Sequence, residues 1–346
     1  MRKLFIVIIL FLATAIPVNA MEFTAPEVPD SGREIFPEDA QTFSEGLWMI
    51  LKQVISQIKP SISKAASSCL ALMVITLIVS ILKLLPGSTD KVIDFVAVLS
   101  IAIVLLQPTG TLIRLGTETV IELSEYGKLL LPVLTGVLAA QGGAVTSSAI
   151  YTGTMIFDVI LSTMISNVIV PMIYFLLCIC VADAAFHQSF LSKLKDFIKW
   201  LMTWGLKLIL YIFTGYMSIT GVVSGTADVA ALKATKLTIS GLVPVVGNLL
   251  ADASESILVG ASVMKSAVGI YGLLAILAVW IGPFLEIGAQ YLLLKTTHGV
   301  CEIFSQKSSI KLIKDFSSAM GMLLAMTGTM CLLLLISVVC FIKGVG

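Results

Sequence analysis

The chain consists mainly of long apolar runs that are separated by short polar or basic stretches. A helix needs about 20 apolar residues to cross the hydrocarbon of a membrane. Six runs predict such crossings, and a tight turn joins the shorter second run to the first: residues 65–85, 92–107, 151–181, 197–223, 266–294 and 317–342. The pattern therefore predicts an all-α, polytopic membrane protein with about six transmembrane helices.

Two further apolar stretches are interrupted by proline, glycine and polar residues, namely residues 129–148 and 241–265. Backbone groups that are freed at such breaks need partners, which only protein or water supplies at membrane depth. We therefore expect two re-entrant or broken helical hairpins that line a pore or substrate path; the alternative is close helix packing by small residues. The candidate path residues in them are Pro132, Gly136, Gln141, Gly142, Gly143, Pro244, Gly247 and Asn248.

The interrupted stretches belong to a pattern that recurs along the chain. Pro132 and Pro244 are 112 positions apart in LLPVLTGVLA and LVPVVGNLLA, and Pro171 and Pro283 have the same spacing. The motif SKLKDF recurs as KLIKDF with seven extra residues before it. Duplication is a familiar plan in transporters, whereas apolar segments also resemble one another by chance. The pattern favours two membrane repeats, at residues 129–223 and 224–346.

The N-terminal part of the chain has three predicted segments. Residues 1–20 carry Arg2 and Lys3 before an apolar core and end in VNA, which predicts a signal peptide; an uncleaved anchor is the alternative. Residues 21–63 then lie outside the cytoplasm in either case, and an amphipathic helix at 41–58 rests on the outer membrane face or on a partner. Residues 64–128 hold the first two crossings and an amphipathic stretch, 109–128, polar enough to lie at the membrane surface.

Basic residues predict the orientation of the crossings. The segments SKLKDFIK and KTTHGVCEIFSQKSSIKLIKD are rich in lysine, and both lie inside if each interrupted hairpin returns to the outer face. That arrangement satisfies the positive-inside rule and leaves both mature ends outside. If the interrupted stretches cross fully instead, the two basic segments fall on opposite sides and the halves are inverted.

Several ionisable residues lie within predicted crossings, among them Asp94, Asp158, Lys207 and Glu286. Asp158, Lys207 and Glu286 are costly in such positions and usually face the interior of a bundle or a water-filled path. Asp158 is placed to pair with Lys207 on the next crossing, and Glu286 precedes Gln290 by one turn, which predicts a polar stripe facing a cavity. The alternative is that these residues only hold helices together.

Composition and motifs exclude several classes of protein. The chain is 58% hydrophobic and 12% charged, far from the quarter charged that is usual in soluble domains. A net charge of +1 with no long basic block gives no indication of a nucleic-acid partner. No nucleotide loop, HExxH or GxSxG motif is present, and the six cysteines have no CxxC spacing. We expect neither an enzyme nor a cofactor or metal, so any transport energy comes from an ion gradient or a separate subunit.

The stretch ALKATKLTISGLVPVVGNLLADASESILVGASVMKSAVGIYGLLAI, residues 231–276, closely resembles the hallmark region of the stage III sporulation protein AE family of endospore-forming bacteria. The likeness extends over the chain, through the signal peptide, the acidic outer segment, the paired early crossings and the apolar C-terminal half. The resemblance implies a protein made in the mother cell and placed in the outer forespore membrane, with its mature N-terminus facing the intermembrane space.

The resemblance also implies partners. The family acts with other proteins of its operon, including a separate ATPase, and joins a forespore-made partner across the intermembrane space. We therefore expect a core subunit of a channel or secretion-like complex that supports forespore development after engulfment. The alternatives are a stand-alone secondary transporter with a relay through Asp158, Lys207 or Glu286, and a purely structural anchor.

Overall fold

The computed structural model describes residues 25–38, 40, 42–84, 90–186, 188–242, 247–304 and 307–343, without the side chains of residues 90, 221–266 and 304–309. Every regular element in this part of the chain is helical, which confirms the all-α prediction. The elements are α2 (Asp30–Arg33), α3 (Phe43–Gln57), α4 (Lys59–Leu82), α5 (Asp90–Ala140), α6 (Ala144–Met164), the π-helix η1 (Ile165–Ile169), α7 (Val170–Phe186), α8 (Ser189–Leu242), α9 (Gly247–Phe304) and α10 (Lys307–Lys343).

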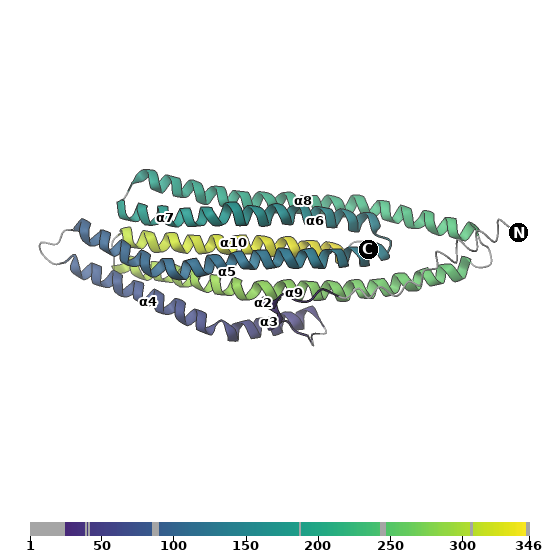
Figure 1. Ribbon diagram of the computed structural model, residues 1–346, viewed down its shortest axis with the longest axis horizontal. Coiled ribbons are helices and arrows are strands. Elements are labelled where there is room, and N and C mark those ends of the chain that lie inside the picture. Colours follow the sequence, from purple (N-terminus) through teal and green to yellow (C-terminus); the bar gives the residue numbers. More distant parts are fainter. Residues whose placement is uncertain are drawn as a thin grey trace.

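Six of the described helical rods are long and apolar enough to cross a membrane, as predicted. They are α4, α5, the continuous rod α6–η1–α7, α8, α9 and α10, and they run alternately in opposite directions along one elongated bundle (Figure 1). We call the end where α7 meets α8 and α9 meets α10 the basic end, because it carries the lysine-rich segments 193–199 and 307–314. Both predicted basic segments therefore lie at the same end of the molecule.

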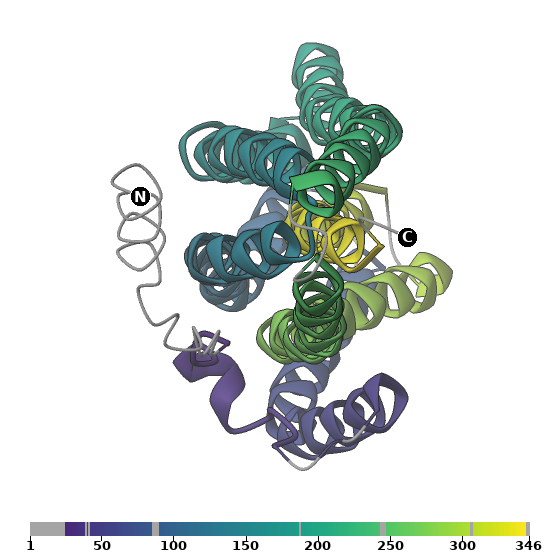
Figure 2. The same ribbon diagram turned by 90° about the vertical axis from the view of Figure 1, so that its right-hand side faces the viewer.

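Helix α10 occupies the centre of the bundle. It packs against α5, α6, α7, α8 and α9, and the view along the axis shows it surrounded by the other rods (Figure 2). Phe316, Leu323 and Met326 on α10 are fully buried. Glycines on neighbouring helices let the side chains of α10 approach closely. A Cβ on Gly127 of α5 would lie 2.8 Å from the Leu334 side chain on α10. Small residues at contacts between helices are typical of membrane bundles.

Three helices are much longer than a membrane crossing. Helices α5, α8 and α9 have 51, 54 and 58 residues, which correspond to about 77, 81 and 87 Å at 1.5 Å per residue. The hydrocarbon core of a bilayer is about 30 Å thick. These helices therefore continue far beyond it, and α8 and α9 extend past the ends of the other rods (Figure 1).

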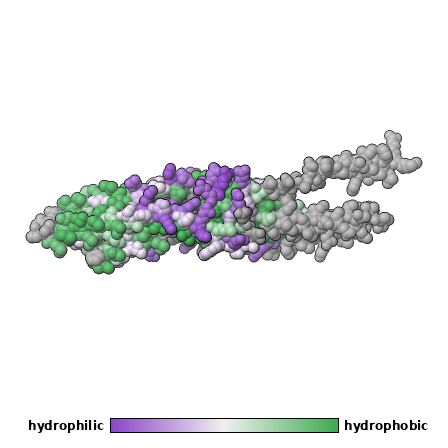
Figure 3. All heavy atoms as spheres, turned by 90° about the horizontal axis from the view of Figure 1, so that it is seen from below, coloured by the Kyte–Doolittle hydropathy of each residue, from purple (hydrophilic) through white to green (hydrophobic). Residues whose placement is uncertain are grey.

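The predicted surface stretch at residues 109–128 is instead the middle of α5. Its apolar face, with Val120, Leu123 and Tyr126, is buried in the bundle, whereas Arg114 and Glu118 are exposed. The amphipathic pattern was correct, but the apolar face packs on neighbouring helices and not on lipid. One view of the surface shows a second division, along the long axis: the part toward the basic end is apolar and the middle of the molecule is polar (Figure 3).

The first interrupted stretch forms a helical hairpin whose break lies later than the proline. Helix α5 continues through Pro108 and Pro132, and the chain turns only at Gln141–Gly143 before α6 begins. Gly142 has a φ of 89°, a conformation that glycine adopts without strain. In the second stretch, Pro244 lies outside the described residues, and Gly247 and Asn248 begin α9. The internal duplication stays a prediction.

The segment that precedes α4 folds back onto the bundle. Thr42 caps α3 by accepting a hydrogen bond from the Glu45 backbone N–H at 3.3 Å. The apolar face of α3, with Ile50 and Val54, is buried, and α3 packs mainly on α9. The amphipathic helix predicted at residues 41–58 is therefore present, and its apolar face covers its own chain.

Close contacts hold the residues before α3 against α9 as well. The Phe36 and Tyr271 rings are 4.6 Å apart between centroids, and Ser31 donates a hydrogen bond to Glu122 on α5. A Cβ on Gly32 would lie 2.9 Å from Val279 Cγ2 and 3.1 Å from the Val279 backbone nitrogen. The backbone of α9 cannot move aside easily, so this contact requires glycine.

We expect Gly32→Ala to loosen the N-terminal segment, because overpacking a close contact costs about 1–3 kcal/mol. Cleavage of the purified protein by a glutamate-specific protease at Glu27 and Glu38 should become several-fold faster. The matched control is Gly110→Ala in α5, since nothing lies within 4 Å of a Cβ there. Equal cleavage rates in the two variants would show that the contact at Gly32 does not hold the segment.

Candidate functional site

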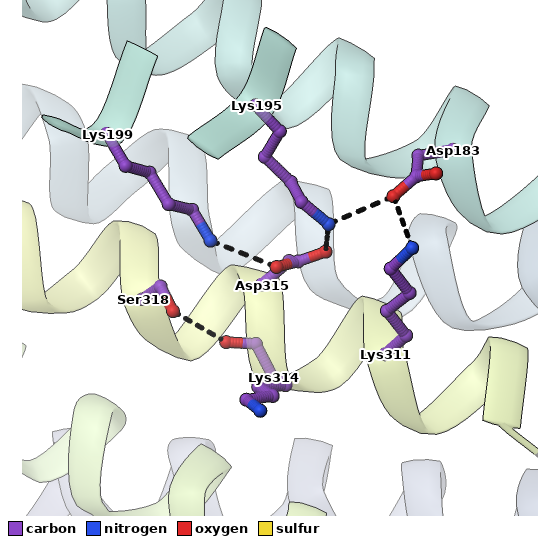
Figure 4. A network of polar contacts seen from close by, with 7 residues as sticks. All are labelled: Asp183, Lys195, Lys199, Lys311, Lys314, Asp315 and Ser318. Carbon is purple, nitrogen blue, oxygen red and sulfur yellow. Dashed lines mark hydrogen bonds and ion pairs between the residues drawn. The ribbon is translucent and has the colours of Figure 1, made fainter. Parts of the chain in front are cut away.

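Charged side chains from three helices meet inside the bundle near its basic end. Lys195 on α8 donates to Asp183 on α7 at 2.9 Å and to Asp315 on α10 at 2.5 Å (Figure 4). All three residues are at least 95% buried. Two further lysines complete the group, which we call the ion cluster: Lys199 lies 3.0 Å from Asp315, and Lys311 lies 2.8 Å from Asp183.

The ion cluster holds three positive and two negative groups. Taking such charges out of water is costly, and the attraction between them compensates only when the geometry is good. Here each carboxylate has two lysine partners, and Lys195 bridges both carboxylates. Ionisable groups inside a membrane bundle commonly mark functional sites. The arrangement fixes the relative positions of α7, α8 and α10, and it offers two lysines at its less buried edge.

The two copies of the KDF motif supply opposite charges to the ion cluster. The first copy contributes Lys195, while its Asp196 is exposed; the second contributes Asp315, while its Lys314 is exposed and lies apart from the ion pairs (Figure 4). The buried charged position therefore differs by one residue between the copies: it is the lysine of KDF in the first copy and the aspartate in the second. The sequence showed both motifs only as basic segments, and nothing in it indicated which charged residue of each is buried.

The predicted pair between Asp158 and Lys207 does not form. Asp158 on α6 is buried and accepts a hydrogen bond from Ser124 on α5 at 2.6 Å. Lys207 lies on the exposed face of α8, and none of the ion pairs among the described side chains involves it. Two crossings that are adjacent in sequence can still present these residues in different directions. The structure therefore shows no direct contact between Asp158 and Lys207, and a relay that uses them stays a prediction.

The residues of the first hairpin are divided between the interior and the surface. Gln141 is buried, and its side-chain nitrogen has no hydrogen-bond partner in the structure. Gly136 is partly buried, whereas Pro132 lies on the exposed face of α5. The structure thus brings Gln141 inside and leaves Pro132 outside, and a path that uses both stays a prediction.

Glu286 and Gln290 line a cavity of about 700 Å³ between α4, α5 and α9. They are one turn apart on α9 and share a face, as the predicted polar stripe requires. Gln290 is 3% exposed, and its side-chain nitrogen has no hydrogen-bond partner in the part of the chain that the structure describes. The part of the chain that the structure describes contains no group of three or more His, Cys, Asp or Glu residues that would hold a metal ion.

We expect Asp315→Asn to lower the free energy of unfolding by about 3–5 kcal/mol, because it leaves Lys195 and Lys199 short of a buried counter-charge. The matched control is Asp196→Asn, the exposed aspartate of the other KDF copy, which should stay within about 0.5 kcal/mol of wild type. Unfolding in mixed micelles with increasing SDS measures both.

Replacing the lysines of the two KDF copies tests the same ion pairs from the basic side. Lys195→Met should destabilise the protein strongly and Lys314→Met should not, since only Lys195 is buried. Equal changes in the free energy of unfolding for the buried and the exposed residues would contradict a stabilising role of the ion cluster.

Comparison with known proteins completes the description of the chain. The family model for stage III sporulation protein AE matches residues 38–344. A protein of that name from Bacillus subtilis (strain 168) is 22% identical over 267 residues, which are 76% of this chain and 66% of that protein. No solved structure matches the chain. The family match covers nearly all of the helical bundle, including both KDF motifs, and the chain therefore belongs to the stage III sporulation protein AE family.

Proposed function

We propose that this multi-pass membrane protein is a core subunit of a channel or secretion-like complex that joins the mother cell to the forespore. The observation that carries the proposal is the length of α5, α8 and α9, which exceeds the hydrocarbon thickness more than twofold. A protein that only anchors or only transports across one bilayer needs no such extension. Helices that continue beyond the membrane provide a surface for subunits in the intermembrane space.

The packed centre of the bundle supports a role as a subunit over a role as a stand-alone transporter. Helix α10 fills the middle of the described bundle with fully buried side chains such as Leu323 and Met326. A conduit would then run between copies of the chain or between the chain and its partners. The separate ATPase of the operon would supply energy, because the chain itself carries no nucleotide-binding motif.

The N-terminal segment is the proposed contact with the partners outside the membrane. One face of α3 covers α9, but the other carries Trp48, which is 70% exposed, and Ile55. Exposed tryptophan beside aliphatic residues is typical of interaction hot spots. In the outer forespore membrane this segment would face the intermembrane space, with the basic end in the mother-cell cytoplasm according to the positive-inside rule.

We expect Trp48→Glu to reduce co-purification of the other operon-encoded sporulation proteins by about tenfold or more, since loss of a hot-spot residue costs at least about 2 kcal/mol of binding. Gln57→Glu, at an exposed position on the other side of the same helix, is the matched control. Unchanged recovery of partners in the Trp48 variant, with normal protein levels, would argue against this surface.

Labelling of introduced cysteines from one side of the membrane tests the proposed orientation separately. A cysteine at Ser44 should react with an impermeant maleimide added from the intermembrane side, and a cysteine at Gln188 should react only after the membrane is permeabilised. Cys178 is the exposed native thiol among the described cysteines and is replaced by serine first. Labelling of both sites from the same side would overturn the six-crossing orientation.

A further inference from the structure

The cavity beside Glu286 has the features of a binding site that the proposed subunit role does not use. Its volume of about 700 Å³ lies within the range of small-molecule sites, about 300–1,000 Å³. The buried Gln290 nitrogen lines it and has no acceptor among the described residues. A buried donor without a partner costs free energy, so an acceptor that enters the cavity would be favoured.

The charges of the cavity define the ligand that fits it. Glu286 and Lys64 both line the cavity, and neither forms an ion pair among the described side chains. One acid and one base give a net charge of zero. A ligand with a primary ammonium and a phosphate leaves neither residue unmatched: the ammonium donates to Glu286, and the phosphate accepts from Lys64 and Gln290. A purely anionic ligand would leave Glu286 without a counter-charge.

The position of the cavity places it at the level of lipid headgroups. Exposed apolar side chains are dense on the outer faces of α4 and α5 toward the basic end, as far as Leu70 on α4 and Leu106 on α5. Beyond these two positions the exposed apolar residues are isolated, as at Ile62 and Ile121. Polar residues of the cavity follow directly, with Lys64 on α4 and Gln107 on α5. Ile103, which is 72% exposed, forms an apolar rim on the lipid side. The cavity therefore opens where hydrocarbon gives way to headgroups.

We infer that the cavity between α4, α5 and α9 binds a zwitterionic headgroup that carries a primary ammonium and a phosphate, as in phosphatidylethanolamine. The headgroup enters from the membrane past Ile103, its ammonium lies against Glu286, and its phosphate lies between Lys64 and Gln290. The acyl chains remain along the exposed apolar faces of α4 and α5. The bound lipid would fix α4, the outermost crossing, against α9.

The test uses the full-length protein in mild detergent with an equimolar mixture of phosphatidylethanolamine, phosphatidylglycerol and phosphatidylcholine with matched acyl chains. Retained lipid is measured by mass spectrometry. Wild type should retain phosphatidylethanolamine about tenfold over phosphatidylglycerol, the effect expected of one charge-assisted hydrogen bond. Phosphatidylcholine should be retained weakly, because its quaternary ammonium has no N–H to donate.

Variants assign any preference to the cavity. Glu286→Gln keeps the shape of the side chain and should reduce the preference to within about twofold. Gln290→Leu should instead lower the retention of all three lipids, because they share the phosphate that Gln290 contacts. The matched control is Glu302→Gln, an exposed position on the same helix. If Glu286→Gln is unstable, Gln290→Leu decides, and unchanged retention of the three lipids by that variant overturns the inference. Equal retention of the three lipids by wild type, or a preference that survives Glu286→Gln, overturns the inference.

Competition with free phosphoethanolamine distinguishes the source of the headgroup. Displacement of the lipid by millimolar phosphoethanolamine would show that the cavity recognises the headgroup alone. Failure of displacement, together with a preference that Glu286→Gln removes, would show that the acyl chains contribute to binding. Either result supports the site.

Discussion

Burial of α10 is the constraint on which the rest of the structure depends. Lipid tails are as apolar as leucine, so helices in a membrane associate through close packing and polar contacts and not through the hydrophobic effect alone. Helix α10 satisfies this requirement along its length, with Leu334 against Gly127, Ser337 accepting a hydrogen bond from Thr154 at 2.9 Å, and Asp315 in the ion cluster. The surrounding rods take their positions from these contacts.

The fold could be predicted where the signal is local. Six crossings were found because run length and apolarity belong to each segment by itself. The stretch 129–148 was predicted to be interrupted without a single break point. The helix continues through Pro132 and the chain turns at Gln141–Gly143, because neighbouring helices let a membrane helix continue through proline. Residues 109–128 were assigned to the membrane surface because an apolar face that meets lipid and one that meets protein have the same period in the sequence.

The sites were predictable only within one helix. Glu286 and Gln290 were recognised as a stripe because residues four apart share a face. Asp158 and Lys207 were paired wrongly because the sequence does not state how adjacent helices are rotated. The ion cluster was missed for the same reason: Lys195 and Asp315 occupy different positions in matching motifs, and only the rotation of α8 against α10 decides that these two residues meet.

The length of α9 has a mechanical consequence. Helix α9 runs as one helix from Gly247 to Phe304, and Pro283 inside it removes one backbone hydrogen bond, which makes this position the place where the helix bends most easily. The basic end of α9 is connected through its loop to α10, which carries part of the ion cluster. A tilt of about 10° in a rod of 58 residues displaces its tip by about 15 Å. A small change of angle in α9 is therefore enough to move its far end by a large distance.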